Sequence, residues 1–166
     1  MPSPVEAPDV RIDRTTATRW VLRATQTLSQ PRDVVFPFFS DASNLERITP
    51  AEMGFQILTP TPIAMRAGAT IDYRIRLYGL RLRWRTLISE WNPPFEFVDV
   101  QARGPYAEWI HRHRFTPTTG GGTLVDDEVH FRLPLGLLGI VGAPLVKRQL
   151  RRIFAYRYDA ITRAFP

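Results

Sequence analysis

The chain has 166 residues and no cysteine, and its 22 Lys and Arg residues exceed its 16 Asp and Glu residues by a formal net charge of +6. A hydrophobic fraction of 44% is typical of globular proteins, and this length suits one domain with a substantial core but leaves two domains marginal. The lack of cysteine excludes a disulfide framework and a thiolate metal site, and it favours a reducing compartment.

Signals for targeting and for nucleic-acid binding are weak in this sequence. The first residues lack the uninterrupted apolar core of a signal peptide, and no later run reaches the roughly 20 apolar residues of a membrane-spanning helix. The positive charge comes mostly from arginines that are spread over many predicted strands. Since neither a recognition helix nor an exposed aromatic platform is evident, we expect a cytoplasmic protein with no nucleic-acid partner.

The N-terminal part of the chain divides into an arm and the start of a domain. Residues 1–17 are rich in proline and small polar residues without a period, which indicates a flexible arm, part of which could extend the edge of a sheet. The domain is expected over residues 18–166. Its first element is Arg19–Leu28, where apolar and polar residues alternate as in a half-buried strand.

Two short helices are predicted after this strand. The first, Pro31–Phe39, is strongly apolar and begins with a proline, which suits the first turn of a helix. The second begins at Ser43, whose spacing to Glu46 matches a capping box, and it closes before Pro50.

The rest of the chain as far as residue 133 predicts strands that are separated by Gly and Pro turn residues. The six predicted strands are Met53–Thr59, Thr70–Tyr78, Leu80–Trp91, Phe95–Arg103, Ala107–Thr116 and Thr123–Leu133. Because connections this short require antiparallel neighbours, these six strands form one meander.

The C-terminal segment, from Ala143 to Phe165, predicts one long amphipathic helix. Its apolar stripe recurs at a spacing of 3.6 residues and comprises Val146, Leu150, Phe154, Ile161 and Phe165. It is the only predicted element long enough to cover an apolar sheet face. The predicted fold class is therefore α+β, a helix-grip fold in which a curved, seven-stranded antiparallel sheet surrounds the long C-terminal helix.

Two histidines lie on one face of the predicted strand Ala107–Thr116. Alternate side chains share a face, so Trp109, His111, His113 and Phe115 point together, and the aromatic residues mark this face as the inward one. Two imidazoles at i and i+2 can bind a metal, act as acid and base, or be hydrogen-bonded in a pocket wall. We predict no metal and no cofactor, and we keep both histidines as candidate catalytic residues.

Further polar residues fall on apolar faces of the predicted elements. Asp99 and Asp127 alternate with apolar strand residues, and buried carboxylates are costly unless they are paired. Arg157 lies within the apolar stripe of the last helix, so we predict that it is buried and pairs with one of these carboxylates. The cluster is either a structural ion-pair network or the polar end of a pocket, where Arg157 and a histidine hold a ligand carboxylate or carbonyl. The full predicted ligand-binding set is Tyr73, Trp84, Asp99, Gln101, Trp109, His111, His113, Phe115, Asp127, Phe154 and Arg157.

The connection Leu133–Pro144 is unusually apolar, yet its glycines and prolines disfavour a rigid helix. It can serve as a mobile gate beside the cavity or pack as an ordinary loop. Lys147 and three nearby arginines suggest a third possibility, transient contact of residues 133–152 with an anionic membrane surface.

The order of the predicted elements after Thr18 resembles that of the START/pollen-allergen-like superfamily, often written SRPBCC. Residues 36–41, 44–45, 48–50, 104–106, 109–115 and 153–157 are similar to a bacterial branch that is described as ligand-binding or polyketide-cyclase-like. The resemblance implies a cavity between sheet and helix for lipids, polyketides, sterols or hormones. Some members catalyse cyclisation or dehydration there, but their catalytic residues differ between branches, so no catalytic motif carries over.

Three function classes therefore remain open. The first is binding or carriage of a hydrophobic small molecule, because the strong signals all concern enclosure of apolar volume. The second is a cyclase or dehydratase that uses His111 or His113 as general base and Arg157 to stabilise an enolate. The third is a regulatory interaction protein with a vestigial pocket. No nucleophile with its base is evident, which favours a binding protein over an enzyme, and the oligomeric state is left open.

Overall fold

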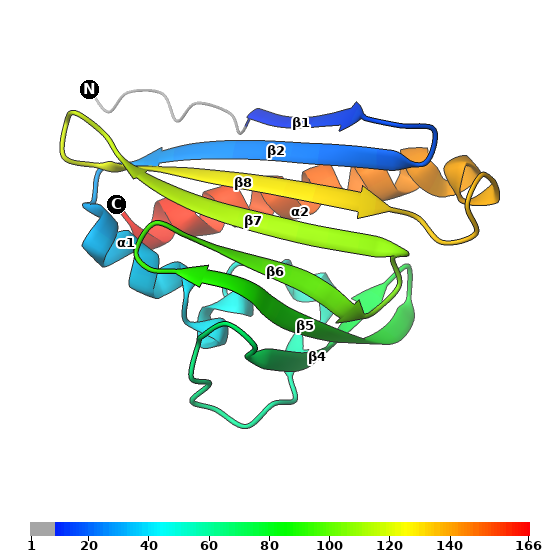
Figure 1. Ribbon diagram of the computed structural model, residues 1–166, viewed down its shortest axis with the longest axis horizontal. Coiled ribbons are helices and arrows are strands. Elements are labelled where there is room, and N and C mark those ends of the chain that lie inside the picture. The colour runs from blue at the N-terminus through cyan, green and yellow to red at the C-terminus, as the bar shows by residue number, and fades with distance from the viewer. Residues whose placement is uncertain (1–8) are drawn as a thin grey trace.

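Eight antiparallel strands form one sheet in the order β1-β2-β8-β7-β6-β5-β4-β3 (Figure 1). The computed structural model describes residues 9–166. The strands are β1 (Asp9–Arg14), β2 (Arg19–Leu28), β3 (Gln56–Ile57), β4 (Thr70–Leu77), β5 (Leu80–Asn92), β6 (Glu96–Arg103), β7 (Glu108–Pro117) and β8 (Thr123–Arg132). The helices are α1 (Arg32–Phe39), η1 (Ala42–Leu45), η2 (Ala51–Met53), η3 (Leu138–Gly142) and α2 (Ala143–Ala164).

The predicted meander is confirmed, because β3 to β8 follow one another in the sheet as they do in the chain. The strand count of seven is wrong by one. Asp9–Arg14 lies within the predicted flexible arm but pairs along β2 as an edge strand, where Val10 and Ile12 pack against the core while charged residues alternate with them. The arm is thus replaced by a strand over these residues, and its first eight residues lie outside the described part of the chain.

The predicted strand Met53–Thr59 is wrong over most of its length. Met53 belongs to η2, and only two residues, Gln56–Ile57, form a strand. Gly54 has a φ of 49°, a left-handed conformation that turns the chain out of η2. Beyond Ile57, the backbone N–H groups of Leu58 and Thr59 both donate to the carbonyl of Asp72, so the regular ladder stops there.

The second short helix begins earlier than predicted. It is the short 3-10 helix Ala42–Leu45, and its cap is Asp41 rather than Ser43. The backbone N–H and the hydroxyl of Ser43 both donate to Asp41 Oδ1, at 2.9 and 2.7 Å. The first helix, Arg32–Phe39, agrees with the prediction within one residue.

Irregular pairing bends the sheet, and the long helix α2 lies along it. The β5–β6 ladder shifts register twice, between Arg85 and Thr86 and between Ile88 and Glu90, and such bulges bend a strand. Figure 1 shows α2 running along the part of the sheet that contains β2 and β8. Within residues 9–166, no helix has both the length and the apolar character needed to cross a membrane.

The predicted stripe of α2 faces the sheet, as expected. Leu150 and Phe154 are buried against a cluster that includes Trp20 and Phe131, and Ile161 joins a second cluster near the other end of the helix. The amide of Gln26 on β2 also donates to the carbonyl of Tyr158 and the hydroxyl of Thr162. These contacts fix α2 over one part of the sheet and leave space beside it.

Candidate functional site

A cavity of about 180 Å³ lies between the sheet, α2 and the segment from α1 to η2. One water needs only about 10–15 Å³, so the cavity has room for a small organic molecule. Most of its wall is apolar, and the lining residues are Phe39, Ala42, Leu45, Ile48, Thr49, Met53, Phe55, Met65, Ile71, Tyr73, Ile75, Trp84, Thr86, Ile88, Phe97, Asp99, Trp109, His111, His113, Ile153, Phe154 and Arg157.

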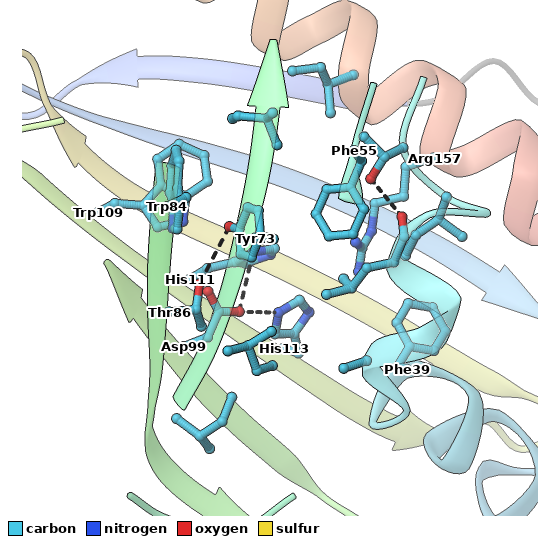
Figure 2. A pocket seen from close by; sticks show the side chains of 18 of the residues that line it. Phe39, Phe55, Tyr73, Trp84, Thr86, Asp99, Trp109, His111, His113 and Arg157 are labelled. Carbon is cyan, nitrogen blue, oxygen red and sulfur yellow. Dashed lines mark hydrogen bonds and ion pairs between the residues drawn. The ribbon is translucent and has the colours of Figure 1, made fainter. Parts of the chain in front are cut away.

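Aromatic side chains from three strands form one part of the wall (Figure 2). Tyr73 and Trp84 stack with ring centroids 5.9 Å apart, and Trp109 meets Trp84 edge to face at 5.4 Å. The Tyr73 hydroxyl lies 3.4 Å from the hydroxyl of Thr86, and burial raises the pKa of Tyr73 well above its usual value. This phenol therefore stays neutral and presents an apolar ring with one hydrogen-bonding group to the cavity.

The polar side chains at and behind one part of the wall come from three neighbouring strands and from α2. The ladder places His111 opposite Asp99 of β6 and His113 opposite Asp127 of β8. Because alternate residues of β7 share a face, both histidines point inward beside these carboxylates, as the alternation predicts. Arg157 approaches the same group from α2. We call these five residues the polar cluster.

Each histidine of the polar cluster lies between the two carboxylates. His111 Nε2 is 3.0 Å from Asp127 Oδ1, and its Nδ1 is 3.7 Å from Asp99 Oδ2. His113 Nε2 is hydrogen-bonded to Asp99 Oδ2 at 2.9 Å. Its Nδ1 is 2.7 Å from Asp127 Oδ1 but off the direction of a hydrogen bond, so we treat that contact as an ion pair. Figure 2 shows Asp99 joined to both imidazoles.

The charges of the polar cluster support one another. Burial and the charge of His113 lower the pKa of His111, whereas at His113 the carboxylates of Asp127 and Asp99 outweigh burial and raise the pKa. Burial alone would raise the pKa of Asp127, but Arg157 and His113 hold it well below its usual value. The pKa of Asp99 is also lowered, because the hydrogen bond from His113 and the charge of His111 outweigh burial. The surroundings thus favour the neutral form of His111 and the charged form of His113.

The prediction that Arg157 is buried and pairs with a carboxylate is confirmed. Its side chain is 12% exposed, and Nε lies 3.5 Å from Asp127 Oδ2 without forming a hydrogen bond there. The guanidinium also lies over the ring of Phe39, 5.4 Å from the ring centroid. Since Arg157 lines the cavity and Asp127 does not, the arginine can present donors to a bound molecule.

The structure brings most of the predicted ligand-binding residues to the cavity wall: Tyr73, Trp84, Asp99, Trp109, His111, His113, Phe154 and Arg157. It does not bring the other three there. The side-chain amide of Gln101 donates a hydrogen bond to the carbonyl of Tyr106 and accepts one from the backbone N–H of Tyr106. Phe115 is buried among other phenylalanines, and Asp127 lies behind the histidines, at a smaller neighbouring hollow.

Sequence reasoning missed the wall opposite the sheet. That wall comes from α1, η1, η2 and the coil around residue 65, and its residues are Phe39, Ala42, Leu45, Ile48, Thr49, Met53, Phe55 and Met65. Short helices and coil have no period that tells an inward from an outward side chain. The one available signal was the apolar content of residues 35–48.

Solved structures share this fold. A protein of Thermus thermophilus matches with a TM-score of 0.68 and 16% identity, covering 88% of this chain and 99% of its own. A START superfamily protein from Mycobacterium smegmatis matches with a TM-score of 0.66 and 14% identity, covering 87% of this chain and 96% of its own. Major latex-like protein 151 of Panax ginseng matches with a TM-score of 0.63 and 12% identity, over 90% of this chain and 99% of its own. Neither a protein-family model nor a curated protein matches the sequence.

These matches define the class of protein at the level of its fold. The chain has the α+β helix-grip fold of START-like and major latex-like proteins, so the resemblance seen in the sequence is confirmed for the fold. The cavity described above lies between the sheet and the long helix of this fold.

Proposed function

We propose that the protein binds or carries a hydrophobic small molecule, lipid-like or polyketide-like, inside this cavity. The observation that carries the proposal is the combination of a largely apolar cavity wall with a polar cluster at one side. Apolar walls supply affinity, and a few fixed polar groups orient the ligand. Arg157 and the neighbouring histidine would hold a carboxylate or carbonyl group of the ligand, and the cytoplasm remains the expected compartment.

A cavity-blocking variant tests this proposal. Ala42 is 5% exposed and lines the cavity, so Ala42→Phe is expected to lower the affinity for the fluorescent probe anilinonaphthalene sulfonate at least about tenfold, or about 1.4 kcal/mol. Ala51→Phe, at an exposed residue of the next short helix, is the matched control and should bind like wild type. Equal probe binding by both variants and wild type would show that the cavity is not the binding site.

A second candidate function is acid–base catalysis on a polyketide-like substrate. The favouring observation is that His113 Nε2 and Asp99 Oδ2 lie 2.9 Å apart on the wall of one open space. Binding and catalysis differ in what is recovered after incubation. A carrier returns its ligand unchanged, whereas a dehydratase returns a product that is lighter by one water and a cyclase can return an isomer of the same mass. Liquid chromatography coupled to mass spectrometry of the extracted ligand distinguishes these outcomes by mass and by retention time.

Contact with an anionic membrane surface through residues 133–152 belongs to the same proposal. Large apolar side chains are exposed there, and we call this set the leucine patch: Leu135, Leu137, Leu138, Val141 and Leu145, each 56 to 86% exposed. The helix turns that follow carry Lys147, Arg148, Arg151 and Arg152. A groove containing Arg148 and Arg152 shares Met53 and Ile153 with the cavity, so a membrane at this surface would lie beside the cavity wall.

Vesicle binding tests the leucine patch. The double variant Leu138→Asp/Val141→Asp is expected to cosediment at least about tenfold more weakly with phosphatidylcholine–phosphatidylserine vesicles, since burying one large apolar side chain contributes about 1.5–3 kcal/mol. Val34→Asp is the control, because Val34 is 51% exposed on α1, at the other end of the sheet from η3. Wild-type protein that fails to sediment with these vesicles would rule out membrane contact.

A further inference from the structure

We infer that Asp99, His111 and His113 form a binding site for one divalent transition-metal ion, of which zinc is the representative, on the wall of the cavity. Each of the three side chains offers one ligand atom, and these atoms all lie within 4.8 Å of one another. Two imidazole nitrogens and one carboxylate oxygen are a donor set that suits zinc and other late divalent transition metals.

The spacings of the two imidazole nitrogens from Asp99 Oδ2 fit ligands of a single ion. Two atoms that are each about 2.1 Å from a metal are about 3.0 Å apart at a right angle, and about 3.6 Å apart at about 120°. His113 Nε2 is 2.9 Å and His111 Nδ1 is 3.7 Å from Asp99 Oδ2. Both distances therefore correspond to neighbouring positions in the coordination sphere of one ion.

Asp127 supplies the support that metal-binding histidines usually have. Its Oδ1 lies 3.0 Å from His111 Nε2 and 2.7 Å from His113 Nδ1, the ring nitrogens that do not face Asp99. Metal-ligating histidines commonly donate their other N–H to a carboxylate, which fixes the tautomer and the ring orientation. Of the two contacts with Asp127, that of His111 Nε2 is a hydrogen bond, whereas that of His113 Nδ1 is close but off the direction of one. The nitrogens beside Asp99, His111 Nδ1 and His113 Nε2, are the ones left to bind metal. Asp127 is thus a positioning residue.

The arrangement leaves the ion open toward the cavity. Asp99, His111 and His113 all line the cavity, whereas Asp127 lies behind them. Three protein ligands with remaining positions open to a cavity are typical of a catalytic or ligand-binding metal site rather than a closed structural one. The site does not depend on the proposed hydrophobic ligand, because its donors are in place without one.

The test uses untagged, chelator-treated full-length protein that is equilibrated with zinc alone, followed by measurement of bound zinc. Wild type is expected to bind one equivalent, and His111→Gln/His113→Gln at least about 100-fold more weakly, as expected when two ligands are lost. His130→Gln is the matched control, because His130 is 44% exposed on β8 and hydrogen-bonded to Glu128. It should bind like wild type. No binding by wild type, or unchanged binding by the double variant, would overturn the inference.

A second measurement avoids variants that fail to fold. In wild type labelled with ¹⁵N at histidine, zinc should shift the ring-nitrogen signals of His111 and His113 and leave those of His130 in place. Unchanged signals of His111 and His113 in the presence of zinc would overturn the site. Binding of anilinonaphthalene sulfonate is measured on the same metal-free samples. Probe binding without zinc binding leaves the proposed function standing and removes the metal site, and zinc binding without probe binding does the opposite.

Discussion

Replacing Arg157 by leucine is expected to lower the free energy of unfolding by about 3–5 kcal/mol, the usual cost of removing one partner from a buried ion pair. Its side chain is 12% exposed, and that of Asp127 is 8% exposed, so water cannot take over the lost interaction. Arg157 is also the strongest of the partners that hold the pKa of Asp127 down against burial. Urea denaturation of wild type and variant measures the difference.

The control for this variant is Arg151→Leu, an exposed position on the same helix, which should change stability by no more than about 0.5 kcal/mol. The pair of variants also separates two roles of Arg157. If the arginine serves only to clamp an acidic group of the ligand, Arg157→Leu will keep wild-type stability and lose affinity. Equal stability and equal probe binding in both variants would mean that the ion pair contributes nothing.

Phe115→Ala is expected to be comparably severe, with a loss of about 3–5 kcal/mol from the cavity it leaves in the core. Phe115 is 2% exposed, and its ring meets those of Phe36 and Phe39 edge to face, each at 5.2 Å between centroids. These contacts join β7 to α1, so the loss should appear as a lower melting temperature and a lower urea midpoint. Binding of anilinonaphthalene sulfonate by the variant that remains folded should change little.

Phe95→Ala makes the same chemical change at an exposed position. Phe95 is 51% exposed, and the guanidinium of Arg32 lies over its ring, 4.4 Å from the centroid, so a loss of about 0.5–1 kcal/mol is expected. If Phe115→Ala matched this small loss but abolished probe binding, Phe115 would line the ligand site, as the sequence alone had suggested.

Periodicity made much of the fold predictable. Alternation located the long strands, and the 3.6-residue stripe located α2 and its buried residues Leu150, Phe154 and Ile161. The edge strand β1 was anticipated only as a possible edge extension of the arm and was not counted, because its alternation is short and its polar positions are charged. The length of β3 was overestimated. An apolar run does not reveal that Gly54 adopts a left-handed conformation, or that the carbonyl of Asp72 accepts two hydrogen bonds where the ladder ends.

The polar cluster was predictable residue by residue but not in its geometry. Strand alternation turned His111 and His113 inward, and the helical stripe placed Arg157 among apolar residues. Sequence could not supply the register that sets Asp99 opposite His111, because register depends on the turns and on packing across the sheet. The prediction of no metal was made without knowledge of that register. The register brings the imidazoles of His111 and His113 close to Asp99, and those distances are the basis for the proposed zinc site.

The pairing of β2 with β8 has a consequence for how the protein is made. Arg23 and Glu128, which are hydrogen-bonded across these strands, are 105 residues apart in sequence. The meander from β4 to β8 closes through short turns, but β2 and α1 leave the ribosome long before β8 exists. Until synthesis reaches β8, the apolar side chains of Trp20 and Leu22 lack their final partners, Phe131 and Val129, so the nascent chain must be kept from aggregating through this N-terminal segment.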